Sequence, residues 1–257
     1  MKKFSTLLVV LLLMLASFTA GVEYQRGDVD QDGLVGISDV TCLIDYLLNG
    51  TWPDEPVSPD EHEYVDLGLP SGTLWATCNV GANVPEEYGD YFAWGETEPK
   101  DVYSWETYKW CNGTNNTLTK YCTNSNYGYN GFTDGKMELE LEDDAAYVNW
   151  GHSWRMPTAA QQRELFDNGI WTWTTRNGMK GCLVTGPNGN SIFLPASGYR
   201  WGESLYNAGS IGSYWSNTNV AGGDTAYSLY FNSSELDWCS HDLNSGFTVR
   251  PIRVSQN

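Results

Sequence analysis

The stretch Trp150-Gly-His-Ser-Trp-Arg-Met-Pro-Thr158 joins two large aromatic residues, an arginine and a Pro-Thr pair in one short run. Thr158 is followed by Gln161, a spacing that fits a capping box. In that motif the threonine hydroxyl accepts from the amide three residues on, and the glutamine side chain reaches back. We therefore expect a helix to begin after Thr158 and to run to about Asn168. Gly169 is then expected to end it with a positive φ, which glycine adopts without strain.

Trp150 and Trp154 indicate that this stretch lies in a large core, because indole rings are costly to bury unless a long chain surrounds them. The neighbouring segments are rich in Trp, Tyr and Gly rather than in helix formers. The chain has 257 residues, 41% of them hydrophobic and 14% aromatic, which allows one or two domains and excludes a disordered chain. We expect an α+β fold with short strands, few helices and long loops.

The chain is strongly acidic, with a formal net charge of −18 and runs of acids at residues 54–63 and 138–144. Nucleic acid and anionic membrane surfaces both require a basic footprint on the protein, so neither is an expected partner. The acidity is consistent with solubility outside the cell and with cation binding.

Residues 1–21 have the organisation of a secretory signal peptide. Lys2 and Lys3 precede an apolar run over residues 7–15, and small residues follow, with Ala20 or Gly21 as the cleavage position. The run is too short for a stable membrane anchor, and no cysteine near the cleavage position could carry a lipid. We therefore expect an exported protein in the periplasm, at the cell surface or outside the cell, with no transmembrane segment in the mature chain.

All six cysteines follow the predicted cleavage position. An even number permits disulfides in an exported protein, but six cysteines allow fifteen pairings and the sequence does not choose among them. A bond between Cys111 and Cys122 is the preferred pairing, because it would close a short polar loop. Free or buried thiols are the alternative. No CxxC pair is present, and with three histidines a Cys/His zinc site has little support.

Residues 27–39, Gly-Asp-Val-Asp-Gln-Asp-Gly-Leu-Val-Gly-Ile-Ser-Asp, carry the most specific chemical signal in the chain. Acids fall at loop positions one, three, five and twelve, with glycine at position six, which is the arrangement of an EF-hand calcium loop. Gly36 at position nine offers no side chain, so water is expected to complete the shell. An acidic surface turn is the alternative. The predicted Ca²⁺ ligands are Asp28, Asp30, Asp32, Leu34 through its carbonyl, and Asp39.

A helix is expected after this loop, because apolar residues recur at spacings of three and four from Val40 to Leu48 and Asn49-Gly50 ends the pattern. No helix precedes the loop, so residues 22–50 resemble a single dockerin repeat, which is half of an EF-hand. In the dockerin family two repeats pair and dock onto a cohesin. A cohesin-like protein, self-association and the chain's own second domain all remain open as the partner of this helix. Prolines among acids predict an extended linker over residues 51–63.

Residues 64–257 are expected to form the main domain. One hairpin is predicted from residues 64–67 and 73–78, and another from residues 181–185 and 191–194, each around a turn that contains Pro and Gly. Residues 227–232 alternate as a strand. Residues 247–254 are strand-like, and Pro251 favours an edge strand or a bulge there.

Five ordered segments of this domain resemble the Fibrobacter succinogenes major paralogous domain, which is abundant in exported proteins of Bacteroidetes. They are Tyr64-Val-Asp-Leu-Gly-Leu-Pro-Ser-Gly-Thr-Leu-Trp-Ala-Thr, Tyr91-Phe-Ala-Trp-Gly-Glu, Ser153-Trp-Arg-Met-Pro-Thr, Ser213-Tyr-Trp-Ser and Gly246-Phe-Thr-Val-Arg-Pro. The resemblance covers nearly all of residues 64–253. One departure is His152, where relatives usually have a second glycine.

The resemblance implies a C-type lectin-like fold and binding rather than catalysis. It implies that residues 199–214, 217–225 and 234–244 form the ligand surface. Aromatic side chains there can stack on sugar rings or apolar protein patches, while amides and carboxylates bond hydroxyl groups. Tyr214 and Trp215 are expected in the core. The candidate ligand-binding residues are Trp201, Tyr206, Asn207, Asn217, Asn219, Asp237, Trp238, His241, Asp242 and Asn244, with Trp201 and Trp238 expected to be exposed.

Catalysis has weaker support. Two carboxylates suffice for a glycosidase, but with 32 acids in the chain the presence of such a pair has almost no specificity. The chain has no Gly-x-Ser-x-Gly elbow and no His-Glu-x-x-His helix. We expect a non-catalytic binding protein for a glycan or protein ligand. The alternative is an accessory or hydrolase component of polysaccharide degradation, delivered by the dockerin-like tag, with Glu96, Glu98, Asp143 and Asp144 as available carboxylates.

Overall fold

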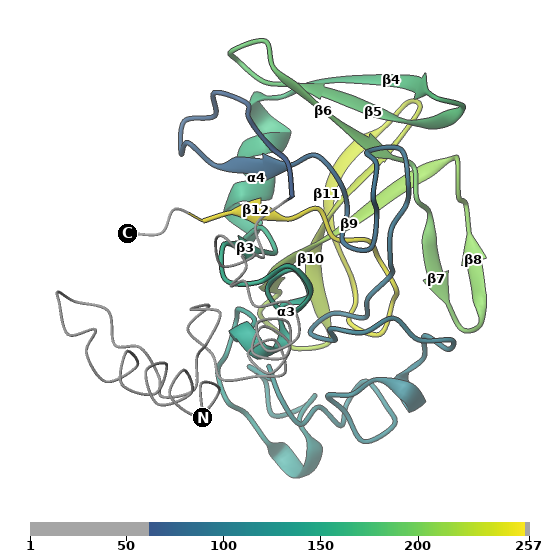
Figure 1. Ribbon diagram of the computed structural model, residues 1–257. Coiled ribbons are helices and arrows are strands. Elements are labelled where there is room, and N and C mark those ends of the chain that lie inside the picture. The colour runs from purple at the N-terminus through teal and green to yellow at the C-terminus, as the bar shows by residue number, and fades with distance from the viewer. Residues whose placement is uncertain (1–61, 255–257) are drawn as a thin grey trace, which may run out of the picture. The chain divides into compact units, whose positions relative to one another are not determined.

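The computed structural model describes residues 62–254, drawn in colour in Figure 1. The predicted signal peptide, the calcium loop with its ligands, the following helix and most of the linker lie outside the described residues. Cys42 lies outside them as well. Within the described part of the chain, no helix is long and apolar enough to cross a membrane.

The capping box after the opening stretch is confirmed. Helix α4 (Ala159–Asn168) has Thr158 as its N-cap, and the side chains and backbones of Thr158 and Gln161 bond reciprocally. The expected positive φ at Gly169 is wrong, because φ there is −81°. Glycine is required for a different reason: a Cβ at this position would lie 2.7 Å from the Leu165 carbonyl oxygen and 2.8 Å from a methyl group of Val184.

A four-stranded sheet joins the two ends of the described domain to the opening stretch. Its order is β1 (Tyr64–Asp66), β2 (Leu74–Ala76), β12 (Ile252–Arg253) and β3 (Trp154–Arg155), all antiparallel. The predicted β1–β2 hairpin is confirmed. Pro251 does not mark an edge strand, because β12 lies between β2 and β3. The proline directly precedes the strand, and its carbonyl accepts from the Ala76 amide at 3.0 Å.

Two further sheets have three strands each. One has the order β11 (Leu236–Asp242), β10 (Thr225–Asn232), β9 (Ile211–Asn219), with an irregular register between Ala226 and Ser228. The other has the order β4 (Ile170–Arg176), β5 (Met179–Thr185), β6 (Ser191–Pro195), and its β5–β6 hairpin was predicted. The strands β7 (Tyr199–Trp201) and β8 (Ser204–Tyr206) form a separate hairpin at the margin of the fold, as Figure 1 shows.

Helices are few. Besides α4, the described residues contain α3 (Ala145–Trp150) and the 3-10 turns η1 (Trp105–Thr107), η2 (Tyr129–Gly131) and η3 (Leu141–Asp143). The rest of residues 77–144 connects the elements as long loops, as expected. The domain is therefore sheet-rich, with a small helical part.

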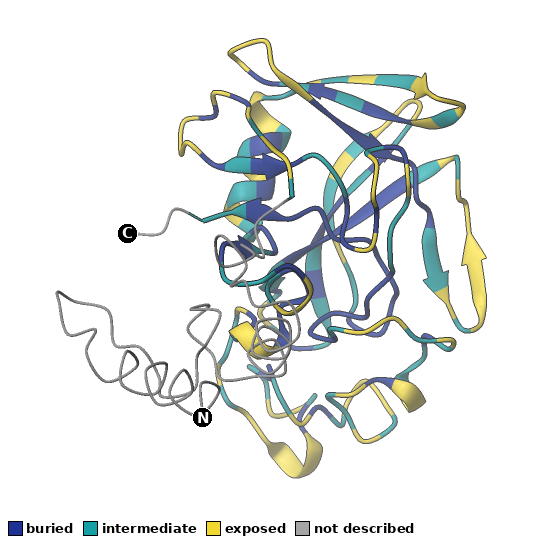
Figure 2. Ribbon diagram, in the orientation of Figure 1, coloured by how far each residue is buried: buried dark blue, intermediate teal, exposed yellow. Residues whose placement is uncertain are grey.

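The β9–β11 sheet separates two cores, which appear as the dark blue interior of Figure 2. Neighbouring residues of β9 point to opposite faces, and both faces are covered. Trp215 stacks on Phe247 with ring centroids 4.3 Å apart in one core, while Tyr214 stacks on Phe231 at 5.9 Å in the other. Trp154 is also fully buried, so the opening stretch belongs to the core as expected.

The expected bond between Cys111 and Cys122 is wrong. Both thiols are free and bond instead to carbonyls in their own loops, Cys111 to Trp105 at 3.0 Å and Cys122 to Asn124 at 3.2 Å. Each sulfur thus has a local partner that does not require the other sulfur. The remaining described cysteines, Cys78, Cys182 and Cys239, are free as well.

Candidate ligand-binding site

A cleft of about 450 Å³ lies between the β7–β8 hairpin and the β9–β11 sheet. Its aromatic wall consists of Tyr199 and Trp201 from the hairpin. Its polar wall consists of residues from the three strands of the sheet, namely Ser213, Tyr230, Ser240, His241 and Asp242. Asn207, Ile211, Ser245 and Phe247 complete the lining.

The pairing of β7 with β8 explains the aromatic wall. Tyr199 lies opposite Tyr206, and Trp201 lies opposite Ser204, so these four residues share one face of the hairpin. The Tyr199 and Tyr206 rings stack with centroids 5.6 Å apart. Trp201 keeps 44% of its surface exposed. The hairpin thus presents a stacked aromatic face to the cleft.

Backbone hydrogen bonds hold this hairpin at its base and at its tip. Arg200 exchanges two of them with Gly246, at 2.8 and 3.0 Å, and Gly202 exchanges two with Tyr103, both at 2.8 Å. Gly198 enters the hairpin with φ 68°, and a Cβ there would lie 2.1 Å from the Tyr206 carbonyl oxygen. The position of the aromatic wall therefore depends on backbone contacts rather than on its side chains alone.

His241 is a neutral hydrogen-bonding group on the polar wall. Its Nδ1 lies 2.8 Å from the Ser228 hydroxyl, and its ring meets Phe247 edge-on at 4.9 Å. Burial lowers the pKa of His241 below its usual value, so the imidazole is uncharged at neutral pH. Ser228 thus engages one of its two ring nitrogens.

Asp242, the last residue of β11, is the one acidic residue in the lining of the cleft. Burial, followed by the charge of Asp224, raises the pKa of Asp242 above its usual value. Among residues 62–254, neither of these aspartates takes part in an ion pair, and the lining of the cleft contains no lysine or arginine. The lining therefore contains one acidic residue and no lysine or arginine.

No family model, curated protein or solved structure matches this chain. The resemblances to the major paralogous domain and to dockerin therefore stay predictions. What the cleft binds is argued below from its own chemistry, which is an aromatic face opposite hydroxyl and imidazole groups.

Four of the predicted ligand-binding residues line this cleft: Trp201, Asn207, His241 and Asp242. A fifth, Tyr206, supports it through the Tyr199 ring. These predicted residues of the hairpin and of β11 therefore lie close together in space, although they are far apart in the chain.

Other predicted residues lie away from the cleft. Asn219 and Asn244 are fully buried, and Asn219 donates to the carbonyls of Tyr121 and Lys136. Asn217 accepts a hydrogen bond from the neighbouring hydroxyl of Thr218. The Asn219 amide thus ties two loops together, whereas neither side-chain polar atom of the buried Asn244 has a hydrogen-bond partner within residues 62–254.

Trp238 and Asp237, also predicted, belong to β11 but not to the lining. The Trp238 ring is half-buried and stacks on Tyr227 with centroids 4.3 Å apart, so the expectation that it is exposed holds only in part. Arg163 of α4 lies over the same ring at 5.9 Å. Trp238 therefore lies on the face of the sheet that α4 covers, opposite to His241.

Tyr230, Ser240 and Phe247 line the cleft but were not among the predicted residues. The alternation of residues 227–232 places Tyr230 on the same face as Ser228. The sequence does not say which face meets the hairpin, because that depends on the pairing of β10 with β9 and β11.

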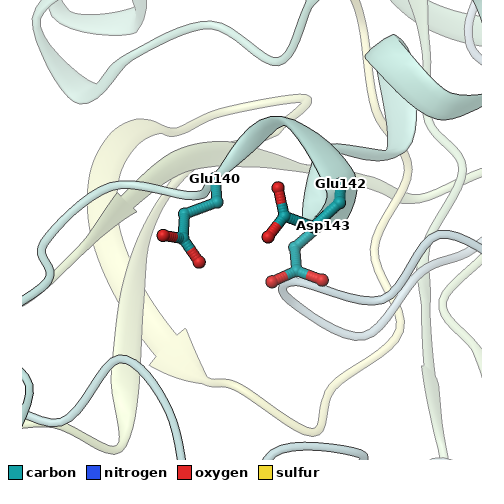
Figure 3. A group of neighbouring side chains, drawn as sticks. All are labelled: Glu140, Glu142 and Asp143. Carbon is teal, nitrogen blue, oxygen red and sulfur yellow. The ribbon is translucent and has the colours of Figure 1, made fainter.

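A cluster of acids on and beside η3, shown in Figure 3, has oxygen atoms close enough to hold a cation: Glu140, Glu142 and Asp143. Lys120 already occupies this position, because its Nζ lies 2.6 Å from both Glu140 and Asp143. The bonds from Lys120 and Lys136 lower the pKa of Glu140 to about 2. The cluster is therefore charge-compensated by the protein itself.

The carboxylates considered for hydrolysis also have structural partners. Glu96 pairs with Lys100 at 2.8 Å, and Asp143 accepts from the Tyr121 hydroxyl at 2.6 Å. Asp144 is the N-cap of α3. Glu98 is exposed in a loop. None of the four lines the cleft.

Proposed function

We propose that this chain is a non-catalytic secreted or cell-surface binding protein whose β7–β8 cleft holds a glycan. The observation that carries the proposal is the opposition of the two walls, with Trp201 exposed on one side and the polar side chains of Tyr230 and His241 on the other. A sugar ring has the same two-sided character, since its C–H face packs on an aromatic ring and its hydroxyl groups need polar partners.

The concave shape favours a glycan over a protein ligand. Protein interfaces of ordinary size bury about 800 Å² on each partner and extend over a broad patch, whereas this site is a single cleft of about 450 Å³. Its dimensions are those of a small-molecule or saccharide site. A protein that inserts one loop or side chain into the cleft is the second candidate ligand.

Binding is favoured over hydrolysis because the lining contains a single acidic residue, Asp242. Glycosidases generally place two carboxyl groups on either side of the scissile bond. The neighbouring Asp224 is outside the lining. A hydrolase or accessory component of polysaccharide degradation is the alternative function.

Replacing Trp201 by alanine is expected to weaken glycan binding by about thirtyfold, since a central aromatic anchor is typically worth about 2 kcal/mol. The test is a glycan array with the full chain, followed by calorimetry on the best ligand. Leu205→Ala is the matched control, because Leu205 has a similar exposed fraction, 40%, but lies on the other face of the hairpin.

Equal losses of glycan affinity in the Trp201→Ala and Leu205→Ala variants would show that the cleft is not the glycan-binding site. Release of reducing sugar from a bound glycan, abolished by Asp242→Asn, would establish the hydrolase alternative instead.

We further propose that residues 22–50 form a calcium-stabilised docking segment. Replacing both Asp28 and Asp30 by alanine is expected to abolish the rise in melting temperature that Ca²⁺ produces, because it removes two of the loop's carboxylate ligands. Replacing Asp54 and Glu55, two acids outside the loop, is the charge-matched control. A rise of unchanged size in the Asp28/Asp30 variant would discard the calcium loop.

A further inference from the structure

Three polar side chains meet on one face of the β9–β11 sheet. Ser228 lies directly opposite Cys239 in the pairing of β10 with β11, and His241 follows Cys239 at a spacing of two, so all three share this face. The His241 Nδ1 atom lies 2.8 Å from the Ser228 Oγ atom and 3.8 Å from the Cys239 Sγ atom. The oxygen and the sulfur are 3.9 Å apart. A nitrogen, an oxygen and a sulfur atom thus form a small triangle.

The size of this triangle suits a transition-metal ion. A point equidistant from the three atoms lies about 2.1 Å from each, which is about the length of zinc bonds to nitrogen and to oxygen. Zinc–sulfur bonds are about 2.3 Å long, so a small displacement of the ion away from the sulfur fits all three donors. The donor atoms therefore already have the spacing that a bound ion requires.

The kinds of donor atom indicate which ion fits. A thiolate and an imidazole are typical ligands of Zn²⁺ and related first-row ions, whereas Ca²⁺ and Mg²⁺ take oxygen ligands. Composition gave little support to such a site, because the chain has three histidines and no CxxC pair. The extended strand nevertheless brings the donors of a Cys-x-His sequence together, since alternate residues point to the same side.

The charges around the triangle favour a cation. Burial has the largest effect on both titratable groups, raising the pKa of Cys239 and lowering that of His241. The negative charge of Asp237, on the same face of β11, acts on both groups and favours the more protonated form of each. Among residues 62–254, Asp237 takes part in no salt bridge. A doubly charged ion is balanced by one thiolate together with this carboxylate.

We infer that Cys239 and His241 form a binding site for Zn²⁺, with the Ser228 hydroxyl and water as the remaining ligands. The ion displaces the proton of the Cys239 thiol and accepts the lone pair of His241 Nδ1. The hydroxyl hydrogen of Ser228 rotates freely, so its oxygen can turn a lone pair to the ion. The Phe247 ring, whose centroid lies 4.9 Å from that of the imidazole, supports the orientation of His241. The inference does not depend on the proposed glycan binding.

The test is a titration of the full chain with Co²⁺, the spectroscopic substitute for Zn²⁺, after treatment with a chelator and in the presence of a phosphine reductant. The unaltered protein is expected to show a thiolate-to-cobalt charge-transfer band in the near ultraviolet, which Zn²⁺ then removes by displacing Co²⁺. This band requires a sulfur ligand, so Co²⁺ bound only by surface carboxylates or by the predicted calcium loop does not produce it.

Cys239→Ser is expected to abolish the band. His241→Gln is expected to weaken Co²⁺ binding by at least about a hundredfold, because even groups that only support a metal ligand are worth about ten- to a hundredfold in affinity. Cys111→Ser is the matched control and is expected to keep the band. The Cys111 thiol is also partly buried, but it bonds to the carbonyls of Trp105 and Tyr108 at 3.0 and 3.6 Å.

A measurement on the unaltered protein makes the same test without any variant. Zn²⁺ is expected to slow the alkylation of Cys239 by iodoacetamide, followed by peptide mass spectrometry, and to leave the alkylation of Cys111 unchanged. Absence of the charge-transfer band, or a band that persists in Cys239→Ser, would overturn the inference. Unchanged Co²⁺ affinity in His241→Gln would overturn it as well, since the thiol would then bind the ion without the imidazole.

Discussion

Replacing Arg250 by methionine is expected to destabilise the protein by about 3–5 kcal/mol. The side chain is 1% exposed and has no carboxylate partner among its bonds. Its guanidinium donates instead to four acceptors at 2.8–3.1 Å, the side chain of Asn79 and the carbonyls of Ala76, Thr77 and Phe193. Methionine fills a similar volume but leaves these acceptors buried without donors.

Urea unfolding measures this loss as a fall in the free energy of unfolding at an unchanged m-value. Arg163→Met is the control. Arg163 pairs with Asp167 at the surface, where both side chains are about half exposed, so its loss is expected to cost less than about 1 kcal/mol. A loss of that small size for Arg250→Met would show that water replaces the guanidinium.

The second large effect concerns pH and Asp144, the buried N-cap of α3. Its carboxylate accepts from the amides of Ala146, Tyr147 and Met156 at 2.9–3.1 Å. Burial nevertheless raises the pKa of Asp144 from 3.8 to about 6, against the effect of those three amides. Between these two values the folded state binds more protons than the unfolded state. The contribution of Asp144 to stability is therefore full below about pH 4 and is lost as the pH rises through about 6.

The expected size of this loss is about 3 kcal/mol, because each unit of pKa difference corresponds to about 1.4 kcal/mol. Unfolding free energies of the unaltered protein and of Asp144→Asn, measured from pH 4 to pH 7, give it as their difference, since asparagine does not titrate. Asp167→Asn, an exposed carboxyl change, is the control and is expected to leave the slope unchanged. A difference that stays constant or grows with pH would show that the three amides outweigh burial.

The features that the sequence predicted correctly are local ones. The capping box at Thr158 and the hairpins β1–β2 and β5–β6 each depend on residues a few positions apart, so their patterns are visible in the chain. The burial of Trp154 also followed from its size and surroundings.

The features that depend on distant contacts were not predictable. Gly169 faces the Leu165 carbonyl and Val184 of another sheet, and β12 is internal only because β3 pairs with it. None of these contacts leaves a repeating pattern in the sequence.

The candidate site was predictable in part for the same reason. The resemblance pointed to loops in the C-terminal third of the domain, which are rich in aromatic and polar residues, and Trp201, Asn207, His241 and Asp242 all line the cleft there. Composition could not separate Trp201 from Trp238, since the difference lies in which face of the sheet each one occupies. Strand pairing decides this, and it is set by the whole domain.

The hydrogen bonds that hold the hairpin at Arg200 and Gly202 bear on the thermodynamics of recognition. A loop that orders only when it binds loses conformational entropy at that moment, and this loss reduces the affinity. Here the pairings with Gly246 and Tyr103 fix the backbone of the hairpin during folding. The conformational entropy of the aromatic wall is therefore lost during folding and not during binding. The cleft is preorganised, so a ligand can associate without a prior rearrangement of the hairpin.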